Sequence, residues 1–266
     1  MTEIRGAATF RTSAEAYDRH VGRYSRELAR ALIEAAGVQA GARALDVGCG
    51  PGALTRELVA LLGADNVAAV DPSVSFVEAS RQRLPRVTIE LGSAEALPFD
   101  DDAFDHALAQ LVINFMTDPH VGVREMRRVT RAGGTVAAAV WDYAGEMTLL
   151  RRFWDAAVAL DPSAGAHDEG RARPLCTPDG LRELWSATGL ADVRVSSAVV
   201  AAGYDDFEDL WRPFERGVGP AGAFAAGLPA DRRATLKAEV RRRLDIPDGP
   251  FRLTARAWIA TGRVPA

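Results

Sequence analysis

The stretch LDVGCGPG at residues 45–52 constrains the fold of this chain more than any other feature. An apolar run, three closely spaced glycines and a helical pattern from Ala53 predict a buried strand, a tight turn and a helix. Glycine adopts backbone angles that side chains forbid and lets a ligand approach the main chain closely. Asp46 places a carboxylate just before this turn, where it would repel a pyrophosphate and attract a positively charged ligand.

Strand-like and helix-like runs alternate along the first half of the chain, which predicts βαβ units and a parallel sheet. Asp118-Pro119 and Thr177-Pro178 predict helix starts, because a capping side chain precedes a proline in the first turn. We expect strands at residues 43–47, 67–70, 87–91, 107–112, 135–141, 193–200 and 253–259. About 50 residues separate the last two, which is long for a simple connection.

Two motifs together resemble the class I S-adenosylmethionine-dependent methyltransferases, in particular the type 11-like group that acts on small molecules. They are the glycine turn and the segment GSAEALPF at residues 92–99, followed by Phe104-Asp105. The resemblance covers residues 14–142 best, and it departs from the family pattern at Ser93, where an aspartate is usual.

The resemblance implies an α/β fold, a Rossmann-like, doubly wound, seven-stranded and mostly parallel sheet with an antiparallel last strand. It also implies an N-terminal helical cap at residues 1–40 and a methyltransferase domain at residues 41–266. Residues 204–250 then form a helical insertion between strands six and seven, which we expect to act as a lid over the strand ends.

S-adenosyl-L-methionine is the cofactor that these residues predict. We expect the turn of Gly48, Cys49, Gly50 and Gly52 to meet its carboxylate through main-chain N–H groups, and Asp46 to face its amino group. Asp71-Pro72 ends the second strand about 20 residues later, where a carboxylate accepts hydrogen bonds from ribose hydroxyls.

The remaining cofactor contacts follow from the resemblance. Ser93, Ala94 and Glu95 would line the adenine pocket, with the Ala94 N–H as a donor to the ring. Gln110 and Leu111 would run beside the methionine part and the reactive methyl group. Tyr24 either closes over the methionine end together with Tyr17 or packs in the core.

Methyl transfer requires the nucleophile to be held in line with the breaking bond, and a general base only if the nucleophile keeps its proton. His20, in the N-terminal segment, is the candidate base; a histidine on a helix surface is the alternative. Asn114, Trp141 and Tyr143 follow predicted strand ends and could line the acceptor pocket or pack at its rim. His, Asp and Cys do not group at metal-ligand spacing, so no metal is expected.

Three other functions share parts of this pattern. An enzyme that binds the same cofactor but catalyses cyclisation or isomerisation would keep the same cofactor residues. A nicotinamide-dependent oxidoreductase would share Asp71 but not Asp46 before the glycines. A non-catalytic binding protein would not need the intact turn.

Composition limits the classes of molecule that we expect this protein to bind. The 266 residues carry a net charge of −4, and the one basic run, Arg241-Arg242-Arg243, has acids nearby, so we expect no nucleic-acid partner. No apolar run is long enough for a membrane span or a signal peptide, and two cysteines make no disulfide framework. We therefore expect a cytoplasmic enzyme with a small-molecule acceptor; the sequence predicts no oligomeric state.

Overall fold

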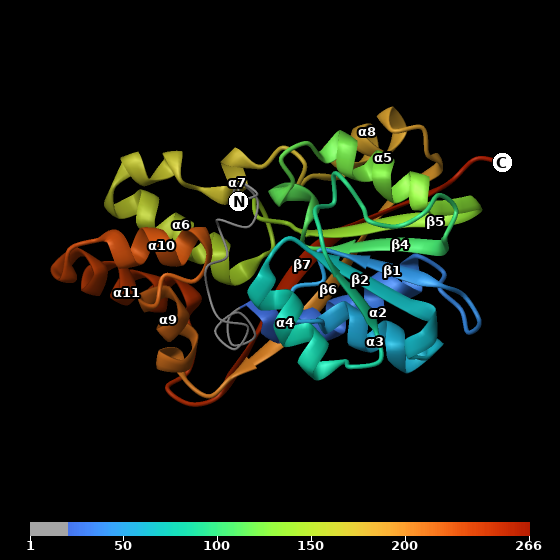
Figure 1. The fold of residues 1–266 in the computed structure, drawn as a ribbon. Helices are drawn as coiled ribbons and strands as arrows, with labels where there is room; N and C mark the ends of the chain where they lie inside the picture. Colours follow the sequence, from blue (N-terminus) through green and yellow to red (C-terminus); the bar gives the residue numbers. More distant parts are fainter. Residues whose placement is uncertain (1–20) are drawn as a thin grey trace.

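The structure, a computed structural model, describes residues 21–266. Its centre is a sheet of seven strands in the order β3-β2-β1-β4-β5-β7-β6 (Figure 1). The strands are β1 Ala44–Val47, β2 Val67–Asp71, β3 Thr88–Leu91, β4 Phe104–Gln110, β5 Thr130–Trp141, β6 Ala191–Tyr204 and β7 Phe251–Arg263. The first five are mutually parallel, and β7 runs antiparallel to both of its neighbours. The predicted doubly wound sheet with a reversed last strand is thus confirmed.

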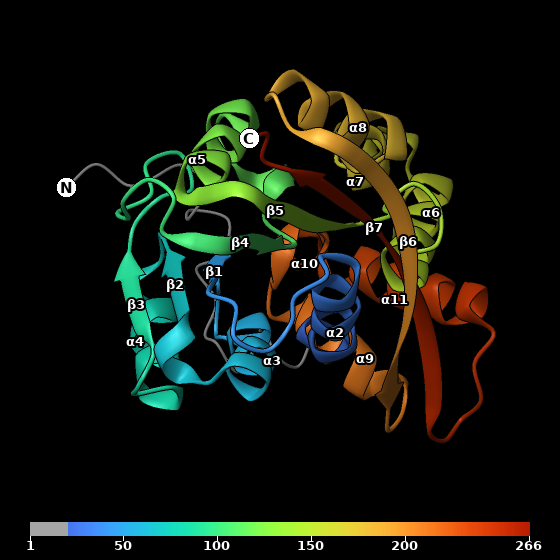
Figure 2. The same ribbon diagram turned by 90° about the vertical axis from the view of Figure 1, so that its right-hand side faces the viewer.

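Helices cover both faces of this sheet (Figures 1 and 2). One face carries α5 Pro119–Val129 and α8 Pro178–Ala187, and the other carries α2 Ser25–Ala35, α3 Ala53–Leu62 and α4 Val74–Arg83. Short 3₁₀ segments are η2 Val21–Tyr24, η3 Ala64–Asn66, η4 Ile113–Phe115 and η5 Pro162–Ala166. The middle strands are buried on both faces, as a sheet packed between two helical layers requires.

The two predicted helix starts are confirmed. The Asp118 carboxylate accepts from the Val121 N–H at 3.1 Å, with Pro119 in the first turn. Thr177 caps α8 in the same way, since its hydroxyl accepts from the Gly180 N–H at 3.1 Å. These caps satisfy backbone donors that have no partner inside the helix.

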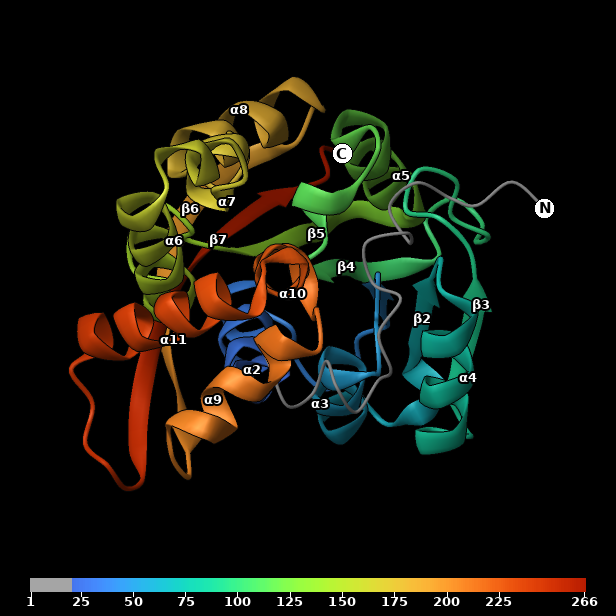
Figure 3. The ribbon, with the colours of Figure 1, turned by 90° about the vertical axis from the view of Figure 1, so that its left-hand side faces the viewer.

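A second group of helices lies beyond the carboxyl ends of the strands (Figures 1 and 3). It contains α6 Thr148–Leu160 and α7 Glu169–Ala172 from the β5–β6 connection, and α9 Phe207–Glu215, α10 Gly219–Gly227 and α11 Ala230–Leu244 from the β6–β7 connection. We call α6, α9, α10 and α11 the upper helical group. Helices therefore do occupy the long connection between β6 and β7.

Two features of the fold differ from the sequence prediction. β5 begins at Thr130, not after Gly134, and its register with β4 shifts between Phe104 and His106. Gly133, with φ +74°, lies inside this bulge, and its N–H donates to Val264. Helix α6 was not predicted at all, and no side chain caps its start at Met147.

Candidate functional site

The glycine turn after β1 leaves an open space against the main chain. Gly50 has φ +52°, and a Cβ atom built on it would meet nothing within 4 Å. Gly48 is different, because a Cβ there would lie 2.5 Å from a methyl group of Val112. Gly48 is thus needed for packing, while Gly50 lets a ligand lie directly on the backbone.

Most N–H groups of this turn are already used inside the protein. The N–H groups of Gly48 and Cys49 both donate to the Val70 carbonyl, at 2.8 and 3.0 Å, and that of Gly50 donates to Asp71 Oδ2 at 2.8 Å. In the described part of the chain no backbone carbonyl accepts from Ala53 or Leu54, in the first turn of α3. An anionic group at this edge would therefore meet the amino end of α3 rather than the turn itself.

Cys49 packs into the turn as a neutral thiol. Its side chain is buried, and Sγ donates to the Gly50 carbonyl at 3.6 Å. Burial, together with the nearby Asp46 and Asp71, raises the pKa of this thiol well above its ordinary value. A raised pKa disfavours the thiolate, which is the reactive form, and the buried position gives Cys49 a packing role.

Asp46 is a buried carboxylate, and one of its two oxygens accepts no hydrogen bond from the described residues. It is 1% exposed, and Oδ2 accepts from the Thr55 hydroxyl at 2.6 Å. Oδ1 has no hydrogen-bond partner among residues 21–266. Burial, reinforced by the charge of Asp71, raises the pKa of Asp46 to about 7. A cationic donor beside Oδ1 would complete this group and favour its charged form.

Asp71 ends β2 beside the same turn. Oδ2 accepts from Gly50 and Oδ1 from the Ser73 N–H at 2.8 Å, so each oxygen keeps one further lone pair. Burial raises the pKa of Asp71 to about 6. Pro72, next along the chain, is partly buried and offers no N–H.

The segment after β3 presents one available amide. Ser93 donates its hydroxyl to Glu95 Oε2, and Glu95 Oε1 accepts from the Thr117 N–H at 2.7 Å. These two polar side chains therefore bond to each other and to the loop before α5. Ala94 lies between them, and in the described structure its N–H donates to no protein group. Of the three, Ala94 is the residue best able to donate to a ligand.

The end of β4 combines an unpartnered amide oxygen with backbone strain. Gln110 Nε2 donates to the Ser25 carbonyl at 3.1 Å, whereas its Oε1 has no partner among the described residues. Leu111 has φ +63°, in the left-handed region; the other described non-glycine residues with positive φ are aspartates. A bulky residue in this conformation marks a place where the surrounding structure fixes the chain.

Tyr24 is part of the core beneath this edge. It is fully buried, its hydroxyl lies 3.1 Å from that of Tyr204, and its ring packs edge-on against Trp141 with centroids 5.7 Å apart. Burial raises the pKa of Tyr24, which keeps the phenol neutral. Of the two readings of Tyr24, the structure places it in the core, with its hydroxyl already engaged.

The predicted base, His20, lies outside the described residues, as does Tyr17. The three other histidines do not converge on the glycine turn. His106 sits near the start of β4 at the opposite edge, and burial lowers its pKa. His120 and His167 are exposed, and the His167 ring packs 5.5 Å from that of Phe224 on α10.

Sequence reasoning missed two hydroxyls that hold the site together. Thr55 on α3 fixes Asp46, and the buried Ser80 on α4 donates to the Gly50 carbonyl at 2.8 Å. Thr55 lies on the apolar face of α3 with Leu54 and Leu58. Ser80 lies on the apolar face of α4 with Phe76 and Val77. A small hydroxyl within such a buried stripe is the signal that could have identified them.

Buried polar atoms without partners concentrate at the carboxyl edge. In residues 21–266 they are Asp46 Oδ1, His106 Nδ1, Gln110 Oε1, both amide atoms of Asn114, Trp141 Nε1 and Trp211 Nε1. Asp46, Gln110, Asn114 and Trp141 lie at or just past the ends of β1, β4 and β5. The sheet order reverses between β1 and β4, where ligands bind in open α/β sheets.

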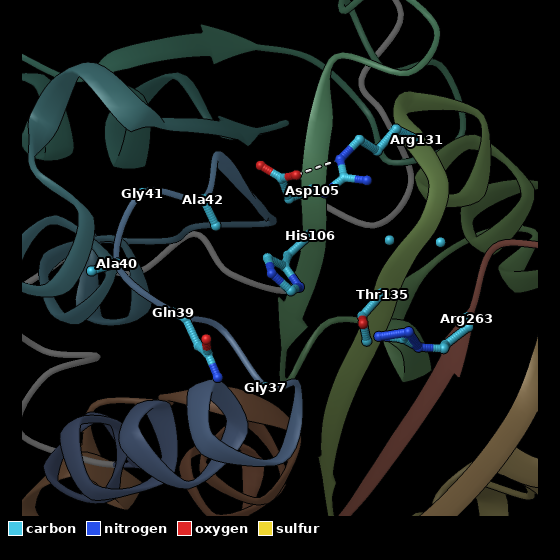
Figure 4. Close-up of a pocket in the computed structure, with 12 residues that line it drawn as sticks. Gly37, Gln39, Ala40, Gly41, Ala42, Asp105, His106, Arg131, Thr135 and Arg263 are labelled. Atoms are coloured by element: carbon cyan, nitrogen blue, oxygen red, sulfur yellow. Dashed lines mark hydrogen bonds and ion pairs between the residues drawn. The ribbon is translucent and has the colours of Figure 1, made fainter.

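A polar cavity of about 420 Å³ lies at the opposite, amino edge of the sheet (Figure 4). Its walls include His106, Thr135, Arg263 and the ion pair between Asp105 and Arg131. It contains none of the residues around the glycine turn, so it is separate from the candidate site.

The sheet order, the open turn and the two buried acids define a class I S-adenosylmethionine-binding protein. A sequence profile described as "Methyltransferase domain" matches residues 45–138, from β1 into β5. The chain is similar to a malonyl-[acyl-carrier protein] O-methyltransferase of Erwinia pyrifoliae, at 29% identity over 79% of this chain and 87% of that protein. It is also similar to a demethylmenaquinone methyltransferase of Roseiflexus castenholzii, at 32% identity over 57% of this chain and 68% of that protein.

A solved structure supports the same fold. Phosphoethanolamine N-methyltransferase 2 of Haemonchus contortus, in complex with phosphomonomethylethanolamine and S-adenosylhomocysteine, aligns with a TM-score of 0.63 and 18% identity. The alignment covers the whole of this chain and 61% of that one. The chain therefore belongs to the methyltransferase-domain family, and it is an S-adenosylmethionine-dependent methyltransferase.

The residues present fit this cofactor. The open space over Gly50, the unpartnered Asp46 oxygen and the available Ala94 N–H offer a main-chain surface, a cation acceptor and a neutral donor at one edge. No group of three or more His, Cys, Asp or Glu side chains within residues 21–266 is arranged to hold a metal ion. Among the described helices, none combines the length and the apolarity of a membrane span.

Proposed function

We propose that this enzyme transfers the methyl group of S-adenosylmethionine to an oxygen, nitrogen or carbon atom of a small, enclosed acceptor. The observation that carries this proposal is the set of unpartnered buried polar groups at the ends of β1, β4 and β5. Each group costs about 1–3 kcal/mol while unsatisfied, so ligands that complete them gain correspondingly.

We assign the cofactor contacts from the geometry described above. Asp46 Oδ1 accepts from the ammonium group, and the free lone pairs of Asp71 accept from the ribose hydroxyls. The Ala94 N–H donates to the adenine ring. Gly50 lies under the cofactor, and the amino end of α3 faces its carboxylate.

When bound, S-adenosylmethionine would supply a sulfonium-activated methyl group to a nucleophilic electron pair of the acceptor, and the electron pair of the carbon–sulfur bond would remain on sulfur. The protein's part is to align the acceptor and to exclude water, which contributes up to about 7–11 kcal/mol in well-oriented reactions. Should the acceptor need a base, His20 stays our prediction for that role.

The upper helical group supports an enclosed acceptor. Its interior is aromatic: the rings of Phe153 and Phe214 stack with centroids 4.8 Å apart, and Trp154 lies 5.3 Å from Phe224. This group faces the carboxyl edge of the sheet (Figure 3). We propose that residues 204–250 form the lid and that the N-terminal segment 1–40 forms a cap beside it. A packed lid favours a small molecule over a folded protein or a nucleic acid.

The named relatives differ in their acceptors and do not fix the acceptor of this chain. One is named for O-methylation of malonyl-[acyl-carrier protein] and one for demethylmenaquinone. The chain shares only 29–32% identity with them, and the segments that would contact an acceptor lie outside residues 45–138 in part.

Calorimetric titration of the purified protein tests the cofactor assignment. S-adenosylmethionine and S-adenosylhomocysteine should bind with micromolar dissociation constants, and NAD should not bind. Binding of NAD alone would contradict the roles of Asp46 and Ala94. Transfer of a labelled methyl group to a panel of small hydroxyl, amine and enol compounds then tests the reaction, and binding without transfer to any of them would favour a non-methylating enzyme.

A further inference from the structure

Asn114 is a buried amide without a single side-chain hydrogen bond. It lies in η4, four residues past the end of β4, and neither Nδ2 nor Oδ1 has a partner among the described residues. Its side chain can donate two hydrogen bonds and accept two. A native structure rarely leaves such a group unsatisfied unless a bound water, an ion or a ligand completes it.

The main chain around Asn114 is anchored by contacts with Arg173. Arg173 Nη1 donates to the Asn114 carbonyl at 2.8 Å, and its guanidinium lies 4.5 Å from the ring of Phe115 and 5.5 Å from that of Tyr143. Arg173 in turn pairs with the buried Glu169 at 3.6 Å. The loop that carries this amide is thus anchored by Arg173.

Charges near Asn114 are balanced within the protein. Arg173 is neutralised by Glu169, which also accepts from Trp154 Nε1 at 3.3 Å. Asp142, directly after β5, pairs with Arg256 at 2.7 Å. The unpartnered groups on this flank, Asn114, Gln110 Oε1 and Trp141 Nε1, are all uncharged. A carboxylate or phosphate on the acceptor would find no unpaired cation among these groups.

Asn114 lies on the opposite side of the switch point from the cofactor residues. The turn, Asp71 and Ala94 belong to β1, β2, β3 and their following segments, whereas η4 packs against β5 and bonds to Arg173, just past the end of α7. Asp46 already provides the acceptor that a cationic cofactor needs. Asn114 therefore remains available for the second substrate.

We infer that the Asn114 amide recognises the methyl acceptor, and that the acceptor presents there an uncharged hydroxyl group on a ring-containing, apolar body. A hydroxyl both donates to an amide oxygen and accepts from an amide nitrogen, which matches the two empty positions of Asn114. The rings of Phe115 and Tyr143, which both pack against Arg173 beside Asn114, suit a flat apolar body. This inference rests on the proposed methyltransferase function and narrows its substrate class.

Binding of two matched probes to the protein saturated with S-adenosylhomocysteine tests it. The probes are 1-naphthol, which is neutral at pH 7, and 1-naphthoate, which is an anion on the same ring system. We expect 1-naphthol to bind at least about tenfold more tightly than 1-naphthoate, and Asn114→Leu to weaken 1-naphthol by at least about tenfold. The affinity for S-adenosylhomocysteine should stay within about twofold in this variant.

Thermal unfolding separates recognition from a structural role. Because the Asn114 amide is buried and unsatisfied, Asn114→Leu should leave the melting temperature unchanged or raise it. Asn66→Leu is the matched control: the Asn66 amide donates to the Leu62 carbonyl at 2.9 Å, so this variant should melt lower and bind 1-naphthol normally.

Four results would overturn the inference: no binding of 1-naphthol to the wild-type protein, a preference for 1-naphthoate, unchanged 1-naphthol binding in Asn114→Leu, or a loss of 1-naphthol binding in Asn114→Leu together with a lowered melting temperature. If S-adenosylhomocysteine itself failed to bind, the proposed function would fail instead, and the two failures are thus distinguishable.

Discussion

At the scale of single residues, the site contains two buried carboxylates and one residue with a strained backbone, each of which costs free energy in the folded protein. Asp46 and Asp71 are carboxylates buried beside each other, and burial raises the pKa of both. Leu111 occupies a left-handed backbone conformation, which costs a residue with a Cβ about 1–2 kcal/mol. The unliganded protein therefore holds several groups whose free energy falls when a suitable ligand binds.

Cofactor affinity should depend on pH through Asp46. Its pKa is raised to about 7 without ligand, whereas a neighbouring ammonium group favours the ionised form. We expect the affinity for S-adenosylmethionine to fall as the pH drops below 7, by up to about tenfold per pH unit. Calorimetry from pH 5.5 to 8.5 measures this. Methylthioadenosine, which lacks the ammonium group, is the control, and an equally steep profile for it would contradict the assignment.

Asp46→Asn makes a companion prediction about stability. A carboxyl whose pKa is raised by folding favours the native state below its unfolded pKa of about 4, and this advantage is lost as the pH rises toward 7. At pH 8 the unliganded Asp46→Asn variant should therefore be more resistant to urea than the wild type, while binding the cofactor more weakly. Equal urea midpoints at pH 8 would count against a buried charge at this position.

Gly50→Val should block the cofactor without unfolding the chain. The new side chain would occupy the open space over the turn, and its positive φ adds about 1–2 kcal/mol of strain. Gly37→Val is the matched control, because Gly37 has φ +68° and equally open surroundings at the other edge. Both variants should lose similar stability by urea titration, and only Gly50→Val should lose S-adenosylhomocysteine binding. Equal binding by both would remove Gly50 from the site.

At the scale of secondary-structure elements, the sequence predicts what local chemistry determines. The starts of α5 and α8 are readable because a capping side chain and a proline mark them, and the seven strands are readable as apolar runs. Helix α6 begins at Met147 without a capping side chain, and the bulge in β5 depends on pairing with β4 and β7. Thr55 and Ser80 act through contacts between distant segments, so the buried helix stripe that marks them does not tell which group each one holds. Asn114 follows a predicted strand end, but its unpartnered amide is visible only in the folded chain.

Loosening the upper helical group should leave the cofactor site around the glycine turn intact. Phe153 is fully buried and stacks on Phe214, so Phe153→Ala should cost about 3–5 kcal/mol within this group. Because α6 packs mainly against α10, α11, η5 and β7, S-adenosylhomocysteine binding beside β1 and β2 should persist while methyl transfer falls. Phe104→Ala is the control: Phe104 is buried at the amino edge, 5.3 Å from Phe99, and its loss should spare the acceptor side.

Hydrogen exchange locates the effect of these two variants. Phe153→Ala should accelerate amide exchange in α6, α9 and α10 and leave β1 and β4 protected. Phe104→Ala should leave amide exchange in the upper helical group unchanged. Accelerated exchange across the whole sheet in Phe153→Ala would show that the upper helical group and the sheet unfold together.

At the scale of the whole molecule, one ion pair joins the beginning of the described chain to α9 of the proposed lid. Both Nη atoms of Arg23, in η2, donate to the Asp209 carboxylate of α9, at 2.7 and 2.6 Å. Tyr24 and Tyr204 meet beside this pair, so the connection bridges 180 residues of sequence. Although burial opposes the charged form, Arg23 holds the pKa of Asp209 below its usual value. The N-terminal segment and the proposed lid are thereby mechanically linked.

Breaking this link should loosen the lid and spare the cofactor site. A double-mutant cycle of Arg23→Gln and Asp209→Asn should give a coupling energy of about 1 kcal/mol, as for a partly exposed bidentate pair. A depressed pKa means that this coupling is present near neutrality and is lost as the pH falls below about 4. Asp209→Asn should raise KM for the acceptor and leave S-adenosylhomocysteine affinity unchanged. A rise in KM for the cofactor alone would show that the pair supports the cofactor site and not the lid.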